Sequence, residues 1–270
     1  MARIDLDQIV AEKFLKKKLP KVVMYFLKKI AHQDDLNELF ASAPGKKNLD
    51  FIDVCMKYFN ITCNVVGLEN LPQDGRRLIF VCNHPQGALE AICIAKVLGY
   101  KYDGKLKFYA NEFLTLIEPL KEMFLPIYKH RNQSRENIQM IKDFYKSDNH
   151  LVLFPAGITA QKCGNKIMDS EWNKGFVKAA IVNQRDVVPL YFQAQNSDLF
   201  YRIENFRRFI HSKINFEIAL FVDEIFKQKG NTFTLYIGNS ICFETFNDTK
   251  SHKEWAAWLR GIVSKLPTLG

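Results

Sequence analysis

The sequence lacks the short motifs by which several large enzyme classes are recognised. It has no GxGxxG or GxxxxGK(S/T) loop for a nucleotide, no GxSxG turn for a nucleophilic serine and no HExxH pair for zinc. Its six His are scattered along the chain, and its six Cys form no CxxC pair or zinc-finger spacing. Nucleotide-binding, serine-hydrolase and zinc-protease functions therefore lack their minimum parts, and we expect no metal site.

Long hydrophobic runs are also missing. The longest early apolar run, residues 22–27, is far shorter than the ~20 residues that a membrane-spanning helix needs. The charged N-terminus lacks the apolar core and cleavage site of a signal peptide. Because several Cys lie in apolar runs, we interpret them as small buried hydrophobes in a reducing compartment. Together these absences predict a cytoplasmic protein.

What the chain does contain is a large apolar fraction and an excess of positive charge. At 270 residues and 47% hydrophobic content, it can form one large domain or a domain with an appendage. The net charge of +9 points to an anionic partner, which can be a nucleic acid, a membrane surface or a phosphate-bearing substrate. We find no recognisable nucleic-acid-binding module and expect no nucleic-acid partner.

The first 48 residues are interpreted as a basic amphipathic helical segment that precedes the main domain, residues 49–270. Apolar residues recur near the helical period from Ile4 to Ile30, and Pro20 divides or kinks the helix. Such a segment can lie in an anionic membrane interface, or it can pack on the domain with a solvated lysine face. Its lysines are Lys13, Lys16, Lys17, Lys18, Lys21, Lys28 and Lys29.

The main domain alternates apolar strand patterns with helical ones, which predicts an α/β fold with a mixed β-sheet flanked by helices. We expect helices around 51–59, from 86 to near Gly99, at 111–118, at 134–147 and from 169 to 183. A last helix begins at a capping box formed by Ser251 and Glu254. The expected strands are 61–67, 78–82, 106–110, 124–128, 151–154, 187–192 and 232–237.

The chain is organised around residues 83–90, where the buried strand 78–82 breaks into a turn and then a helix. Open α/β sheets carry their chemistry at such strand ends. Here an imidazole, His84, lies in the turn and a carboxylate, Glu90, follows six positions later. The carboxylate can fix the tautomer of the ring and raise its basicity, which makes a general base. Alternatively, His84 only caps the helix and Glu90 is a solvated charge.

This stretch resembles the histidine–carboxylate motif of the glycerophospholipid acyltransferase superfamily, whose members include lysophosphatidate acyltransferases. The common form is His, four residues and Asp, whereas this chain has five intervening residues and Glu90. The longer spacing, Pro85 and Gly87 resemble more closely a bacterial, hemolysin-like branch of lipid N-acyltransferases that acylate ornithine or glycine.

Three further stretches follow in the order of the family's motifs. Arg131 lies just past strand 124–128, where the family has an Arg that binds a polar head or phosphate. Residues 154–157 resemble the Phe-Pro-Glu-Gly-Thr motif, with Ala156 in place of Glu, and strand 187–192 resembles a strand with a central proline. The helix start that contains Asp169, Trp172 and Lys174 is also similar to the N-acylating branch.

The resemblance implies transfer of a fatty acyl group from an acyl carrier protein or CoA thioester to a lipid precursor, preferably the amine of a small amino acid. O-acylation of lysophosphatidate and non-catalytic binding of anionic lipid are the alternatives. It implies direct attack on the thioester, no bound cofactor and a peripheral location on the cytoplasmic face of the inner membrane. The implied catalytic residues are His84 and Glu90, and the substrate-binding ones are Asn83, Gly87, Arg131, Phe154, Pro155, Ala156, Gly157, Lys162, Lys174 and Pro189.

Overall fold

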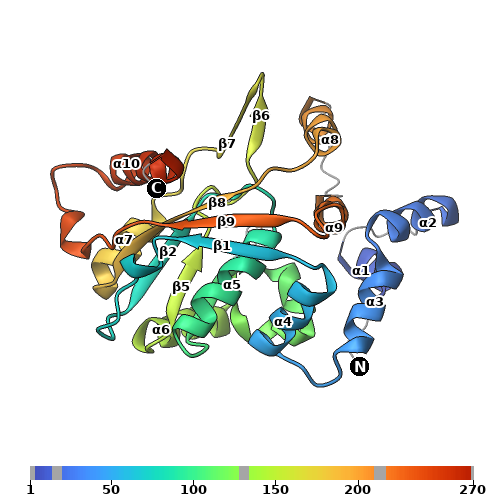
Figure 1. Ribbon diagram of the computed structural model, residues 1–270, viewed down its shortest axis with the longest axis horizontal. Coiled ribbons are helices and arrows are strands. Elements are labelled where there is room, and N and C mark those ends of the chain that lie inside the picture. The colour runs from blue at the N-terminus through green and yellow to red at the C-terminus, as the bar shows by residue number, and fades with distance from the viewer. Residues whose placement is uncertain (1–3, 14–19, 128–133, 210–216, 269–270) are drawn as a thin grey trace.

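A seven-stranded sheet forms the centre of the computed structural model, which describes residues 4–13, 20–127, 134–209 and 217–268. The strand order is β1-β9-β8-β2-β5-β3-β4 (Figure 1). Only β8 and β9 pair antiparallel, so the mixed sheet that the sequence predicts is confirmed. The strands are β1 Thr62–Val66, β2 Leu78–Cys82, β3 Leu106–Asn111, β4 Phe124–Ile127, β5 His150–Leu153, β8 Asp186–Gln193 and β9 Thr232–Ile237.

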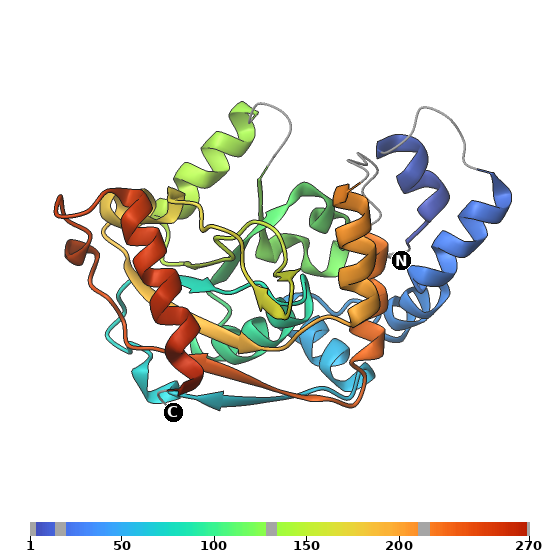
Figure 2. The same cartoon turned by 90° about the horizontal axis from the view of Figure 1, so that it is seen from above.

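Helices cover both faces of this sheet. The α-helices of the described residues are α1 Leu6–Lys13, α2 Lys21–Ile30, α3 Gln33–Ser42, α4 Asn48–Tyr58, α5 Leu89–Lys101, α6 Arg135–Lys146, α7 Gly175–Asn183, α8 Asp198–Phe209, α9 Glu217–Lys227 and α10 His252–Lys265. Figures 1 and 2 show α4 and α5 on one side of the sheet and α10 on the other. The capping box expected at Ser251 and Glu254 is present at the start of α10.

The central strand β2 is buried on both faces because its side chains alternate between two cores. Phe80 packs into one core with α4 and α5, whereas Ile79 and Val81 pack into the other with α7 and α10. All five residues of β2 are fully buried. A strand that is buried on both faces reads as a continuous apolar run, which is the pattern of residues 78–82. This burial fixes the position of the turn that follows β2.

The helix after β2 differs from its prediction at both ends. It begins at Leu89 rather than near Gln86, because Gly87 has φ +100° and cannot lie in a right-handed helix. It also runs through Gly99 to Lys101. A Cβ on Gly99 would lie 2.3 Å from Cδ2 of Leu49, so this glycine lets α4 approach α5 closely rather than ending the helix.

Further segments also differ from expectation, and the helix expected from residue 169 begins at Gly175. In place of one α-helix over 111–118, two 3₁₀ helices occur, Glu112–Leu116 and Glu118–Met123. Pro119 lies in the first turn of the second helix, where its missing N–H leaves no hydrogen bond unmade, so a new helix starts there. Residues 161–168, for which no strand was expected, form an antiparallel hairpin of β6, Gln161–Cys163, and β7, Lys166–Met168, which projects beside α8 (Figure 1).

The N-terminal helices α1, α2 and α3 lie at one end of the molecule (Figure 1). His32, between α2 and α3, stacks on Phe226 of α9 at a centroid distance of 4.0 Å. Its Nε2 lies 3.1 Å from Oδ1 of Asp223, which also belongs to α9. The segment is therefore attached to the main domain, and the proposed boundary at residue 48 stays a prediction. Across the described ranges, no helix has both the length and the apolar character that crossing a bilayer requires.

Candidate active site

The turn between β2 and α5 brings His84 and Glu90 together. Gly87 takes a left-handed conformation, and a Cβ there would lie 2.8 Å from the ring of Phe221. The turn therefore requires glycine for its backbone angle and for its space. It places Glu90 in the first turn of α5, where the side chain points back to His84, two residues beyond the end of β2.

His84 and Glu90 form a short, buried hydrogen bond. Nδ1 of His84 lies 2.7 Å from Oε1 of Glu90, whose side chain is completely buried. The same oxygen accepts hydrogen bonds from the backbone N–H groups of Gln86, at 3.3 Å, and Gly87, at 2.9 Å. Burial alone would raise the pKa of Glu90, but the hydrogen bonds and charge of its partners hold this pKa below its ordinary value of 4.5. Glu90 is therefore an ionised acceptor at neutral pH, not a solvated surface charge.

This geometry suits His84 to act as a base. A carboxylate can only accept, so in the neutral ring of His84 it is Nδ1 that carries the proton and Nε2 that keeps its lone pair. The side chain of His84 remains 16% exposed, in contrast to that of Glu90. Its ring stacks on Phe154 with centroids 4.4 Å apart and planes 16° apart, which fixes the ring's orientation. The pair can therefore remove a proton from a hydroxyl or amine and hold it as an imidazolium.

Residues 154–160 lie against His84. Phe154 contacts the imidazole ring, and the N–H of Ala160 donates to the backbone carbonyl of His84 at 2.7 Å. Gly157 has φ +67°, as expected for a turn that glycine permits. The carbonyl of Pro155 accepts the N–H of Asn173 at 2.9 Å, and the carbonyl of Ala156 accepts the hydroxyl of Ser170 at 3.2 Å. These two bonds close the segment into a loop.

Other predicted residues have structural partners at or near the strand ends. The side chain of Asn83 pairs with the backbone of Phe192, accepting its N–H at 2.7 Å and donating to its carbonyl at 3.0 Å. Lys162 forms an ion pair with Asp198, and exposed Lys174 precedes α7. Arg131 lies outside the described residues. The substrate-binding roles of these residues stay predictions.

Pro189 lies in a central strand, not on an edge. It is opposite Val81 of β2 in the ladder, and its carbonyl accepts the N–H of Gly238 at 2.8 Å. A residue's N–H and C=O point to the same side of a strand, so the missing N–H faces β9. There the regular β8–β9 ladder ends at Ile237 and resumes only as a single bridge at Ile241. The proline therefore lies where the regular ladder stops, and its carbonyl alone bonds to the neighbouring strand.

Hydrogen bonds between the turn and the residues after β8 complete its support, and the sequence did not predict them. Gln86 is buried and donates from Nε2 to the carbonyl of Gln195 at 3.1 Å. Asn196 is also buried and donates from Nδ2 to the carbonyl of Pro85 at 3.3 Å. A signal was available, because adjacent parallel strands end at the same edge of the sheet. The polar residues after strand 187–192 were thus candidates to meet those after strand 78–82.

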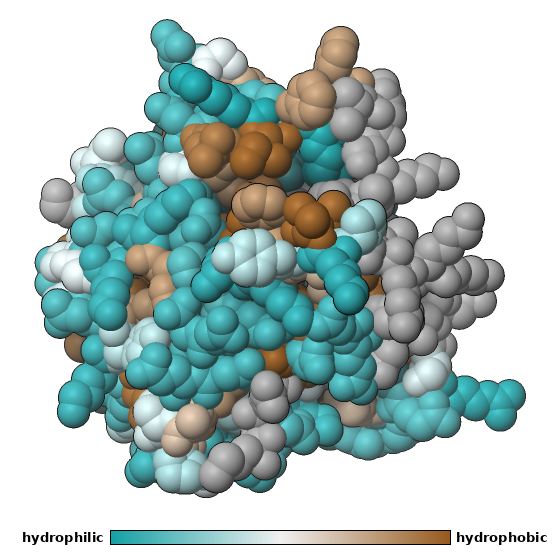
Figure 3. Space-filling model, turned by 90° about the vertical axis from the view of Figure 1, so that its right-hand side faces the viewer, coloured by the Kyte–Doolittle hydropathy of each residue, from teal (hydrophilic) through white to brown (hydrophobic). Residues whose placement is uncertain are grey.

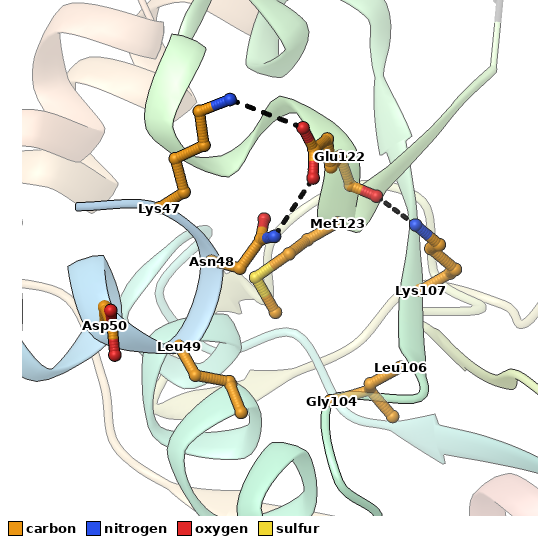
Figure 4. Close-up of a pocket in the computed structure, with 9 residues that line it drawn as sticks. All are labelled: Lys47, Asn48, Leu49, Asp50, Gly104, Leu106, Lys107, Glu122 and Met123. Atoms are coloured by element: carbon orange, nitrogen blue, oxygen red, sulfur yellow. Dashed lines mark hydrogen bonds and ion pairs between the residues drawn. The ribbon is translucent and has the colours of Figure 1, made fainter. Parts of the chain in front are cut away.

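The cavity drawn in Figure 4 is not part of this site. It has a volume of about 310 Å³ and lies at the amino end of β3, whereas His84 lies beyond the carboxyl end of the parallel strand β2. Its polar groups are paired with each other: Lys47 and Asn48 contact the carboxylate of Glu122, and Lys107 donates to the backbone carbonyl of Glu122. Among the described residues, no group of three or more His, Cys, Asp or Glu could hold a metal ion.

Comparison with known proteins agrees with the geometry. The family model described as Acyltransferase matches residues 8–265. The lyso-glycine lipid O-acyltransferase of Phocaeicola vulgatus is 37% identical over 265 residues, covering 97% of this chain and 95% of the relative. The protein of the same name from Bacteroides thetaiotaomicron is also 37% identical over 265 residues, covering 97% of each chain.

The fold has a counterpart among solved structures. The 1-acyl-sn-glycerophosphate (LPA) acyltransferase PlsC from Thermotoga maritima matches 92% of this chain and 97% of its own, with a TM-score of 0.50 and 15% identity. At this identity the match speaks for the fold alone, and it agrees with the mostly parallel sheet flanked by helices. Since the family model and two relatives each cover nearly the whole length, this chain belongs to the acyltransferase family and is an enzyme that transfers acyl groups to a lipid.

Proposed function

We propose that this enzyme acylates the hydroxyl group of a lyso-lipid with an amino-acid headgroup, as a lyso-glycine lipid O-acyltransferase does. The observation that carries the proposal is the 37% identity to two proteins of that name over 97% of the chain. The preference for an amine that the sequence suggested is thereby replaced by a preference for a hydroxyl on the same class of lipid. N-acylation of a free amino acid and O-acylation of lysophosphatidate become outcomes of the test.

The reaction we propose uses His84 as the general base. Nε2 of His84 takes the proton from the acceptor hydroxyl as its oxygen attacks the thioester carbonyl, and the ester forms as the carbon–sulfur bond breaks. The imidazolium then gives the proton to the thiolate leaving group, so no covalent acyl-enzyme is needed. The ionised carboxylate of Glu90, 2.7 Å from Nδ1, stabilises the imidazolium and fixes the tautomer.

A hydroxyl acceptor fits this pair well. A neutral alcohol is a weak nucleophile and needs an adjacent base to become reactive. A free α-amine is mostly protonated at neutral pH, with a pKa near ~8 or above, and must lose a proton before it attacks. The acyl donor we propose is a thioester of acyl carrier protein or CoA, with no bound cofactor. Arg131, in the position of the family's headgroup-binding arginine, is proposed to hold the carboxylate of the acceptor.

Purified enzyme and an acyl thioester should be offered three acceptors separately: an N-(3-hydroxyacyl)glycine, free glycine and lysophosphatidate. We expect an alkali-labile ester from the N-(3-hydroxyacyl)glycine, detected by mass spectrometry before and after mild alkali. An alkali-stable amide from free glycine would instead establish N-acylation. An ester from lysophosphatidate alone would establish the phospholipid reaction, and either result would overturn the proposed acceptor.

We further propose that the enzyme works at the surface of an anionic membrane. Helix α2 exposes Val22, Tyr25 and Phe26 by more than half, and α8 exposes Leu199, Phe206 and Phe209 to a similar degree. Figure 3 shows apolar side chains gathered in clusters on the end of the molecule that carries these helices. Lys21, Lys28 and Lys29 flank the apolar residues of α2. Apolar side chains beside lysines are typical of a helix that lies in a lipid interface.

A further inference from the structure

The backbone of His84 is held from both sides by one segment of the chain, the loop between β5 and α7. The N–H of His84 donates to Oδ1 of Asp169 at 3.1 Å. The carbonyl of His84 accepts the N–H of Ala160 at 2.7 Å. The ring of Phe154, at the start of the same loop, stacks on the imidazole. Glu90 therefore holds one ring nitrogen, while this loop holds the ring face and the peptide groups.

The carboxylate of Asp169 lies between two hydrogen-bond donors. Oδ1 accepts the N–H of His84, and Oδ2 accepts the indole N–H of Trp172 at 2.9 Å. Trp172 is buried in the core that contains α7 and α10, so its indole is a fixed reference point. Arg260 of α10 donates to the backbone carbonyl of Asp169, which anchors the residue from a third direction. The position of His84 is thus linked to the core through Asp169.

We propose that Asp169 is a positioning residue for catalysis: its carboxylate joins the buried indole of Trp172 to the backbone N–H of His84 and so sets where the imidazole lies. The inference rests on the proposed role of His84 as the base. Asp169 does not contact the imidazole ring, so it acts through the backbone rather than on the reacting atoms.

A carboxylate is the only common side chain of this size that serves both donors. Asparagine offers one acceptor oxygen and one NH₂ group, so in either orientation its NH₂ group would meet the N–H of His84 or of Trp172. Burial raises the pKa of Asp169, and its hydrogen bonds only partly oppose that effect. This partly buried carboxylate keeps both of its donors although burial disfavours its ionised form.

The first test is Asp169→Asn, assayed for acyl transfer per folded molecule. Because misplacing a catalytic group by ~1 Å can lower the rate ~100-fold, we expect kcat to fall ~10- to 100-fold with little change in the acceptor KM. The matched control is Asp186→Asn. Asp186 also bridges two donors, the N–H of Phe243 and Nη1 of Arg76, but it lies at the opposite end of the sheet. The control should keep its kcat, and an unchanged kcat in folded Asp169→Asn overturns the proposal.

A second comparison holds even if Asp169→Asn does not fold. In a Trp172→Phe background the indole donor is gone, so asparagine at 169 can turn its oxygen to His84, whereas alanine offers no acceptor. We expect Asp169→Asn/Trp172→Phe to keep the kcat of Trp172→Phe, and Asp169→Ala/Trp172→Phe to lose ~10-fold or more. Equal kcat values in these two double variants overturn the proposal.

Each kcat is expressed relative to wild type on whichever acceptor wild type uses. The positioning role of Asp169 is therefore judged only from the kcat of each variant relative to wild type. The proposed acceptor fails separately, if wild type does not acylate the N-(3-hydroxyacyl)glycine.

Discussion

At the scale of single residues, the site depends on an ionised carboxylate that water does not reach. Glu90 concentrates three donors on one oxygen, the ring of His84 and the N–H groups of Gln86 and Gly87. A buried charge is costly unless it is paired and hydrogen-bonded, and these contacts supply that compensation. Low local dielectric also strengthens its attraction to an imidazolium. The six-residue spacing between His84 and Glu90 allows a contact of 2.7 Å between Nδ1 and Oε1.

Substitutions of the pair should separate the base from its partner. His84→Ala should lower acyl transfer by the ~10²–10⁴-fold typical of losing a general base. Glu90→Gln keeps the shape of the side chain but removes the charge that stabilises the imidazolium, so its loss should be smaller. Both are measured as kcat on protein whose fold is checked by circular dichroism. Near-normal turnover in folded His84→Ala would exclude it as the base, and a larger loss in Glu90→Gln would give the carboxylate another role.

At the scale of elements, local patterns predicted what depends on local chemistry. The strand 78–82, the capping box at Ser251 and the reach of Glu90 back to His84 followed from apolar runs, capping chemistry and spacing. Contacts between distant segments were not predictable in this way. The sequence predicted that the helix ends near Gly99. The helix continues to Lys101, and the close packing of Gly99 against Leu49 explains why a glycine lies inside it.

The same limit applies to the site. Gln86 and Asn196 were not selected, because their partners come from segments more than 100 residues away in the sequence. The β6–β7 hairpin was not predicted, because its three-residue strands leave almost no periodicity. Helix α9 was not predicted at all, although its Phe221 limits the space beside Gly87. Sequence thus predicted that His84 and Glu90 meet, but not most of what holds them in place.

Two glycines with the same backbone angle test how closely β1 and β9 are packed. Gly67 and Gly230 both have φ +82°, but a Cβ on Gly67 would lie 2.2 Å from the carbonyl oxygen of Ile237, whereas nothing lies within 4 Å at Gly230. Gly230→Ala should lower the free energy of unfolding by the ~1–2 kcal/mol that a left-handed conformation costs. Gly67→Ala should lower it by ~1–3 kcal/mol more, because backbone has to move. Urea unfolding of both variants gives the comparison, and equal losses would contradict it.

At the scale of the whole molecule, the turn that carries His84 is supported by two cores and contacts the segment 154–174. The core containing α4 and α5 fixes the start of α5, and the core containing α7 and α10 fixes Trp172. His84 is therefore held from both faces of the sheet. Glu90 of α5 binds its ring, and Asp169 binds its backbone N–H. The exposed apolar residues of α2 and α8 lie outside both cores, which leaves them available for a partner.

Membrane binding through α2 can be tested with a control of equal exposure. Val22 is 67% exposed on α2, and Val182 is 68% exposed on α7. Each apolar side chain that leaves water contributes up to ~1.5–3 kcal/mol, so Val22→Gln with Phe26→Gln should weaken binding to anionic vesicles by ~10-fold or more at low and high salt. Val182→Gln should not.

Replacing Lys16, Lys17 and Lys18 with Gln should weaken the same binding mainly at low salt. Each lysine near the surface contributes ~1 kcal/mol by electrostatics alone, and salt screens that attraction. Vesicle co-sedimentation across a salt series measures both effects. If Val182→Gln reduces binding as much as the α2 variant does, or if neither the α2 nor the lysine variant differs from wild type, the N-terminal helices are not the membrane contact. The exposed apolar face of α8 would then be the next to test, with Phe206→Gln in the same assay.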